Sequence, residues 1–191
     1  VGEFCGGGFG SKGTSYPVQV IPALMSKKIG RPVMMRISRA EEYYLGVARG
    51  GFQGRARLAF REDGRITAAD IYLVQDSGAT PGFWDFRAAA EYVAVTYTPI
   101  SMRMRAVPVH TNTAPRGPQR GPGQNQMANA MEPLLDKAAN ELSISRLDIR
   151  KVNAPTHDSL VAEEHGNLVP LTSSFMNQAL DRGAEMFNWT E

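Results

Sequence analysis

The stretch GRARLAFREDGRITAADIYLV, residues 54–74, decides the fold. In its first half apolar residues alternate with polar ones at Ala56, Leu58 and Phe60, a spacing typical of a strand with one buried face. The Asp-Gly pair at 63–64 is a turn dipeptide that joins two such segments. The stretch therefore predicts an antiparallel hairpin with a core on one side of it.

Segments on both sides of the hairpin predict further elements. Capping residues and apolar periodicity indicate helices over residues 16–28, 88–97, 126–142 and 147–152, and a last helix capped by Thr172 or Ser173 that runs to Phe187. Residues 33–38 and 100–109 are strand-like, and 39–51 and 154–168 read as connections. The sequence predicts an α+β fold, a mixed sheet containing the hairpin with helices packed on it, and no internal boundary within residues 1–191.

Composition narrows the class of protein. The chain has 191 residues, 42% of them hydrophobic, and a net charge of +2, so we expect a globular domain and no dedicated nucleic-acid binder. The single cysteine, Cys5, can form neither an internal disulfide nor an iron–sulfur cluster. No apolar run has the length of a membrane span. We expect a cytoplasmic protein, with the periplasm left open, and the start at Val1 indicates a piece of a longer chain.

A glycine-rich loop, GEFCGGGFGSKGTS at residues 2–15, precedes the first predicted helix. Gly8, Gly10 and Gly13 match the G-x-G-x-x-G pattern of dinucleotide-binding turns. An NADP site is one interpretation, because Arg36 ends the next predicted strand and no acidic residue stands about 20 positions on. Against it, the next elements form a hairpin and not further βαβ units.

Two other interpretations of this loop are local. A phosphate-binding P-loop needs Gly-Lys followed by Ser or Thr, whereas Lys12 follows Ser11 and precedes Gly13, which sets that motif aside. A tight strand-to-helix turn with Phe9 plugging the core accounts for the glycines without a ligand. The loop by itself leaves the dinucleotide site and the tight turn open.

A second unusual loop, TNTAPRGPQRGPGQ at residues 111–124, lies more than a hundred residues further on. Its arginines and glycines allow a non-catalytic assembly module that binds RNA or a protein partner. Nucleic-acid platforms interleave such residues with aromatic side chains, and this loop has none. The assembly module stays an alternative to an enzyme.

Six ordered segments carry a resemblance to a known family. They are GGGFGSK, GRPVMMRISRAEE, the hairpin, TNTAPRG, EPLLDKAANEL and LDIRKVNA, and the closing LTSSFMNQALDRGAEMFNW extends the match. In order and spacing they resemble the molybdenum-binding subunit of the xanthine dehydrogenase and aldehyde oxidase family. The resemblance covers nearly the whole chain and implies roughly the C-terminal half of that family's first molybdopterin-binding domain.

The resemblance implies a cofactor site made from both loops. It implies a molybdenum–pterin cofactor, as molybdopterin or its cytosine dinucleotide form. Gly8, Phe9 and Gly10 are expected on one side of it, and Arg116 and Gly117 on the other. Phe9 and Arg116 would contact the molybdenum centre without being side-chain ligands. Glycine suits such a site, because backbone N–H groups can cradle an anion where no Cβ holds it off.

The substrate positions depart from the purine-binding members of the family. Those members carry a Glu, an Arg and a stacking Phe where this chain has Gly13, Pro81 and Pro118. The polar groups of a purine would have no hydrogen-bonding side chain at these positions. The resemblance therefore implies an aldehyde or another aromatic or N-heterocyclic substrate, with Phe83 and Trp84 at the entrance of its pocket.

The resemblance also implies what this chain lacks. The family hydroxylates its substrates with water as the oxygen source, and a glutamate acts as the general base. Glu163, Glu164 and Glu185 do not match the motif of that glutamate, so we expect it, and any other catalytic residue, outside this chain, which would be inactive alone. The implied partners are the remainder of the molybdenum subunit, chains or domains carrying 2Fe-2S and FAD, and a small-molecule substrate, with no nucleic acid and no membrane.

Overall fold

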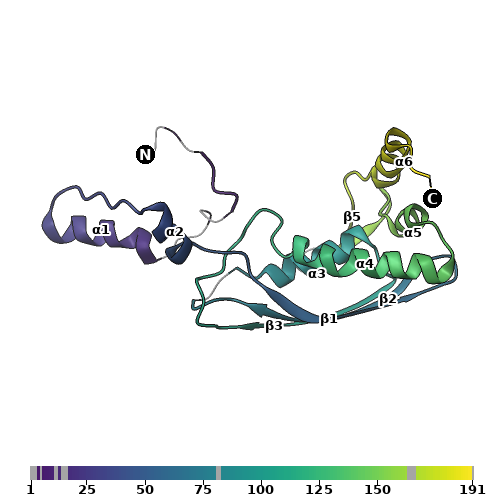
Figure 1. Cartoon of the computed structure of the whole chain (residues 1–191), viewed down its shortest axis with the longest axis horizontal. Helices are drawn as coiled ribbons and strands as arrows, with labels where there is room; N and C mark the ends of the chain where they lie inside the picture. Colours follow the sequence, from purple (N-terminus) through teal and green to yellow (C-terminus); the bar gives the residue numbers. More distant parts are fainter. Residues whose placement is uncertain are drawn as a thin grey trace.

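The computed structural model of the protein describes residues 4, 6–10, 13, 17–80, 83–162 and 167–190 (Figure 1). Its centre is a sheet of three strands in the order β1 (Phe52–Phe60), β2 (Ile66–Asp76) and β3 (Ser101–Val109). The first two strands pair antiparallel and the last two parallel. The predicted mixed sheet with a hairpin is therefore confirmed.

The hairpin turn is fixed by a glycine and by a distant asparagine. Gly64 has φ +84°, and a Cβ there would lie 3.1 Å from Cδ1 of Ile144 and 3.2 Å from Cγ1 of Ile149. The buried side chain of Asn153 donates from Nδ2 to Gly64 O at 2.8 Å and accepts from Ile66 N at 2.8 Å. The asparagine of the LDIRKVNA segment thus ties a C-terminal helix to the hairpin.

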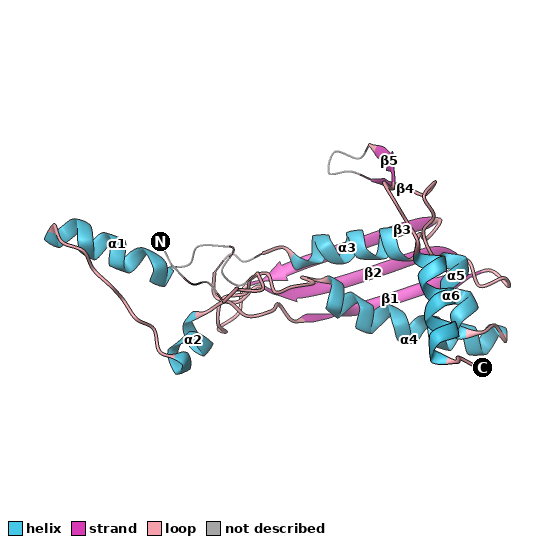
Figure 2. Ribbon diagram, turned by 90° about the horizontal axis from the view of Figure 1, so that it is seen from above, coloured by secondary structure: helices cyan, strands magenta, loops and turns pink. Residues whose placement is uncertain are grey.

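Two helices, α3 (Asp85–Thr96) and α4 (Gln124–Leu142), cover one face of the sheet (Figures 1 and 2). The core between helices and sheet includes the buried side chains Ile71, Val93, Met127, Met131 and Leu135. The apolar stripe predicted for residues 126–142 is confirmed, since Met127, Met131 and Leu135 lie on it. The expectation that no βαβ unit follows the glycine loop is wrong, because β2, α3 and β3 form a parallel crossover.

An arm made of α1 (Pro17–Ile29) and α2 (Arg39–Leu45) extends away from the sheet (Figures 1 and 2). The strand expected over residues 33–38 does not form, because these residues pair with no strand in the described part of the chain. The connection expected after it contains α2. Ser38 and Glu41 form a capping box at its start, a Ser-x-x-Glu signal that the sequence interpretation missed.

The C-terminal part adds α5 (Arg146–Asn153), a small hairpin of β4 (Leu160–Ala162) and β5 (Leu168–Pro170), and α6 (Met176–Phe187). The small hairpin lies in a segment expected to be a connection. The predicted start of the last helix is also wrong: its N-cap is Phe175, which makes no side-chain cap bond. The predicted caps Thr172 and Ser173 lie two to three residues before it, and the Ser174 hydroxyl donates to Pro155 O at 2.8 Å. No helix among the described residues is long and apolar enough to cross a membrane.

Candidate functional site

The two unusual loops meet at the end of the sheet where β2 and β3 finish. Arg120 N donates to Phe9 O at 2.6 Å, which joins the loops directly. Gly10 packs against the other loop so closely that a Cβ on it would lie 2.7 Å from Pro118 O. Gly13 closes the first loop, because its N–H donates to Gly10 O at 2.8 Å. Segments more than a hundred residues apart therefore form one site.

The backbone of the glycine loop has the shape that glycine permits. Gly7 has φ +97° and Gly10 has φ +107°, while Phe9 between them has φ +52°, a rare conformation for a side chain with a Cβ. The Phe9 side chain is 69% exposed. Phe9 is thus not a core plug, and the interpretation of the loop as a turn closed by a buried phenylalanine is wrong.

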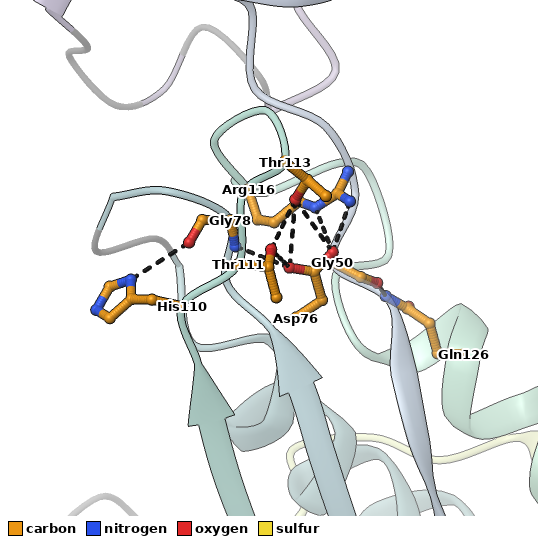
Figure 3. A network of polar contacts seen from close by, with 8 residues as sticks. All are labelled: Gly50, Asp76, Gly78, His110, Thr111, Thr113, Arg116 and Gln126. Carbon is orange, nitrogen blue, oxygen red and sulfur yellow. Dashed lines mark hydrogen bonds and ion pairs between the residues drawn. The ribbon is translucent and has the colours of Figure 1, made fainter.

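Asp76, the last residue of β2, is the centre of a polar network under the second loop (Figure 3). Nε and Nη2 of Arg116 both donate to its Oδ2, at 2.9 and 2.5 Å. Its Oδ1 accepts from the Thr111 hydroxyl at 2.6 Å and from Gly78 N at 2.9 Å. Two of the three guanidinium nitrogens of Arg116 are thus already hydrogen-bonded within this chain.

The charge state of Asp76 follows from these partners. Burial pulls its pKa upward, but the hydrogen bonds from Thr111 and Gly78 and the charge of Arg116 outweigh that effect and lower the pKa to about 2. The side chains of Asp76 and Arg116 are 23% and 20% exposed. The two residues therefore form an ionised, partly buried pair that fixes the conformation of Arg116.

Close packing against Val47 requires a glycine at position 117. A Cβ on it would lie 2.9 Å from Cβ of Val47. Its N–H donates to Ala48 O and the N–H of Ala48 donates to Pro115 O, both at 2.9 Å, in a parallel bridge between Ala48 and Arg116. Gly117 thus lets residues 47 and 48 support the main chain of Arg116 from one side.

The sequence interpretation missed Asp76 and Thr111, and it also missed three residues further from the junction, Arg49, Asp85 and Gly78. Arg49 donates from Nη1 to Gly121 O and from Nη2 to Arg120 O, both at 2.8 Å, which anchors the second loop. Asp85, at the start of α3, is buried, and this burial raises its pKa. Gly78, with φ +71°, lies under the second loop where a Cβ would contact Ala114 O. Only the Asp-Ser-Gly tripeptide at residues 76–78, which begins at the last residue of β2, could have indicated this framework from the sequence.

Donor groups remain on both loops. The main-chain N–H groups of Phe9, Gly10 and Arg116 form no hydrogen bond to another residue that the structure describes. In the β-bridge between Ala48 and Arg116, the hydrogen bonds are made by Pro115 O and Gly117 N, so the N–H of Arg116 is not used. Unpaired main-chain donors next to glycine are the usual means of binding an anion.

The predicted substrate residues lie in two places. Gly13 and Pro118 belong to the junction of the loops, with Gly10 between them. Phe83 and Trp84 border a shallow hollow of about 450 Å³ at the start of α3, where the Arg87 guanidinium stacks 4.2 Å above the Trp84 ring. Neither Gly13 nor Pro118 lines that hollow. Pro81, like Cys5, lies outside the described residues.

The chain belongs to the family described as "Molybdopterin cofactor-binding domain", which matches residues 1–154. This membership confirms the resemblance drawn from the six segments and decides against the dinucleotide-binding interpretation of the glycine loop.

Two relatives of the chain are named as xanthine dehydrogenase subunits. The chain is 32% identical over 164 residues to a probable xanthine dehydrogenase subunit from Bacillus subtilis (strain 168), a match that covers 84% of this chain and 22% of the relative. It is 28% identical over 193 residues to "Xanthine dehydrogenase molybdenum-binding subunit" of Escherichia coli O157:H7, covering 97% and 25%. The chain thus spans about a quarter of the length of these relatives.

Solved structures agree with the fold. Quinoline 2-oxidoreductase from Pseudomonas putida 86 superposes with a TM-score of 0.82 at 28% identity, covering 96% of this chain and 24% of that one. Aldehyde oxidoreductase from Desulfovibrio gigas, at 23% identity and a TM-score of 0.81 over 96% of this chain and 20% of that one, supports the fold alone.

The residues of the site fit the cofactor of the family. Phe9 and Gly10 both have positive φ, and the close packing of Gly10 on Pro118 leaves no room for a Cβ at position 10. Together with the donor groups on both loops, they form a cradle suited to an anionic group. Two guanidinium nitrogens of Arg116 bind Asp76. The main chain of Arg116 is therefore better placed than its side chain to bind such a group.

Proposed function

We propose that this chain is part of a molybdopterin-binding domain, roughly its C-terminal half, of a cytoplasmic molybdenum hydroxylase, and that the loops at 6–10 and 111–120 contact the cofactor. The observation that carries the proposal is the junction between these loops, with Phe9 bonded to Arg120 and Gly10 packed on Pro118. The cofactor would be molybdopterin or its cytosine dinucleotide form.

Each loop has a separate task in this proposal. The main chain of Phe9 and Gly10, shaped by Gly8, holds the cofactor near its metal from one side. The main chain of Arg116 holds it from the other, and Gly117 and Asp76 keep Arg116 in place. No side chain of this loop pair is proposed as a metal ligand.

The reaction we propose is hydroxylation with water. The substrate R–H and water give R–OH, two protons and two electrons: a C–H bond breaks, a C–O bond forms, and the substrate is oxidised. When bound, the molybdenum–pterin group supplies the redox-active, Lewis-acidic centre of this exchange. The electrons leave through 2Fe-2S and FAD groups on other chains or domains. A glutamate outside this chain acts as general base, so the chain alone is inactive.

The substrate we propose is an aldehyde or an aromatic or N-heterocyclic compound. Gly13, Pro81 and Pro118 offer no side-chain hydrogen bond to a purine. Phe83 and Trp84 are exposed aromatic residues suited to the entrance of an apolar pocket.

The arm is the surface we propose for contact with the remainder of the molybdenum subunit. Its helix α1 exposes Ile21, Leu24 and Ile29, and the extended segment after it exposes Met34 to 92%. Apolar side chains gathered in this way mark a surface that another part of the protein covers.

Metal analysis tests the proposal. The full-length protein, with its flanking sequence, is expressed in a host that makes the cofactor and in one that does not, and molybdenum and pterin are measured in both. We expect about one molybdenum per subunit from the first host only. Absence of both from the first preparation would refute the cofactor proposal. Dye reduction with aldehydes, N-heterocycles and xanthine then tests the substrate, and xanthine turnover as fast as that of the best aldehyde contradicts the exclusion of purines.

A further inference from the structure

The face of the sheet opposite α3 and α4 carries no helix of the described chain (Figure 1). Strand alternation places charged and exposed side chains on it. They are Arg55 and Arg57 of β1, Asp70 and Tyr72 of β2, and Arg103 and Arg105 of β3. We call these six residues the basic face. They border a shallow depression of about 520 Å³.

Strand register arranges the basic face in two rows. Arg57, Asp70 and Arg103 lie side by side in one row, since Asp70 is the partner of both arginines in the ladder. Arg55, Tyr72 and Arg105 form the next row in the same way. The spacing of the arginines is therefore fixed by the sheet and does not depend on flexible loops.

The basic face has an excess of positive charge. Arg103 donates to both oxygens of Asp70, at 2.9 and 2.8 Å, and this bond, with the nearby charges of Arg105 and Arg57, lowers the pKa of Asp70. No carboxylate in the described ranges forms an ion pair with Arg55, Arg57 or Arg105. Three positive charges on one rigid face are thus uncompensated within the described part of the chain.

Apolar surface lies among these charges. Tyr72 is 39% exposed and carries the Arg105 guanidinium 5.6 Å from its ring centroid, and Val107 beside them is 43% exposed. Arginine and tyrosine mixed with apolar groups are typical of protein–protein interfaces. A nucleic acid fits less well, because Asp70 stands between the arginines and the basic face offers only one aromatic ring, Tyr72, for stacking of bases.

We propose that the basic face is a docking surface for an acidic patch on another protein chain. Carboxylates of the partner bind Arg55, Arg57 and Arg105, and Tyr72 and Val107 supply the apolar contact. Neighbouring arginines on rigid strands suit carboxylates, because each guanidinium can donate two parallel hydrogen bonds to one carboxylate.

Binding of charged probes to the purified full-length protein tests this. A labelled decaglutamate peptide and a labelled ten-nucleotide thymidine oligomer are titrated at low ionic strength with the wild type and with R55E/R57E. The control is K137E/R182E, which makes the same change of charge at exposed residues away from the face and from the arm. We expect the peptide to bind R55E/R57E at least about tenfold more weakly than the wild type, and K137E/R182E within about twofold of it.

Three results would overturn the proposal: no binding of the peptide to the wild type, equal weakening in both variants, or tighter binding of the oligonucleotide that is lost in R55E/R57E. The neutral variant R55Q/R57Q guards against misfolding, and its thermal transition is compared with that of the wild type. If the glutamate variant does not fold, R55Q/R57Q decides, with an expected loss of about threefold for the peptide. Unchanged affinity in R55Q/R57Q also overturns the proposal.

Discussion

Arg116 and Asp76 form an ion pair in which two guanidinium nitrogens donate to one carboxylate oxygen, at 2.9 and 2.5 Å, across 40 residues of sequence. The pair joins the end of β2 to the loop that carries Arg116. Because the guanidinium serves the framework, the function proposed for Arg116 falls on its main chain. Substitutions at Asp76, Gly10 and Asn153 test this pair, the junction of the loops and the hairpin turn.

Replacing Asp76 with Asn should loosen the second loop. The amide keeps one acceptor but loses the charge that pairs with Arg116, and we expect a loss of about 1–2 kcal/mol in the free energy of unfolding and a lower molybdenum content of the full-length protein. Urea unfolding and metal analysis measure these effects. D70N is the matched control, because it breaks an aspartate–arginine pair of the same strand on the exposed face, and it should leave the metal content unchanged. Equal loss of metal in both variants would contradict a positioning role of Asp76.

The stability that Asp76 contributes should depend on pH. Its pKa in the folded chain is about 2, below its ordinary value of 3.8, so its contribution is fully present above the ordinary value and is lost as the pH falls through about 2. Urea midpoints of the wild type and of D76N, compared at pH 6, 4 and 2.5, should therefore converge as the pH is lowered. A difference that stays constant over this range would show that ionisation of Asp76 contributes nothing.

Replacing Gly10 with Ala should disturb the junction of the loops but not the core. A Cβ would lie 2.7 Å from Pro118 O, and φ is +107°, so the substitution is strained by roughly 2 kcal/mol or more. We expect the full-length protein to lose most of its molybdenum and pterin, with little change in its thermal transition. G183A on α6, outside both loops, is the control, since nothing lies within 4 Å of its added Cβ. A G10A protein with normal metal content would remove the main support for the proposed site.

Replacing Asn153 with Ala should destabilise the fold, because Asn153 supports the hairpin turn and not the proposed cofactor site. The change leaves Ile66 N and Gly64 O without their buried partner, and we expect a loss of about 2–4 kcal/mol in the free energy of unfolding. Urea unfolding measures it, with N140A on the exposed side of α4 as a control of nearly unchanged stability. A small effect of N153A would mean that the hairpin turn needs no support from α5.

Local patterns predicted the elements that depend on neighbours in the sequence. The alternation around residues 54–74 predicted the hairpin, and the stripe of Met127, Met131 and Leu135 predicted the long helix and its buried side. The strand expected over residues 33–38 did not form, because a strand needs a partner that the described chain does not supply. The Ser38–Glu41 cap of α2 was a readable signal that the interpretation passed over.

The sequence by itself determined the hairpin, the helical stripe and the family, because each rests on the spacing of residues along the chain. Only the tertiary structure decided that the parallel pairing of β2 and β3 brings residues 76 and 111 together, that Asp76 binds the Arg116 guanidinium, and that Gly117 packs on Val47. The tertiary structure also decided that Phe9, which the sequence allowed as a core residue, is exposed and has positive φ. These contacts join residues far apart in the sequence, and no local preference of either partner encodes them.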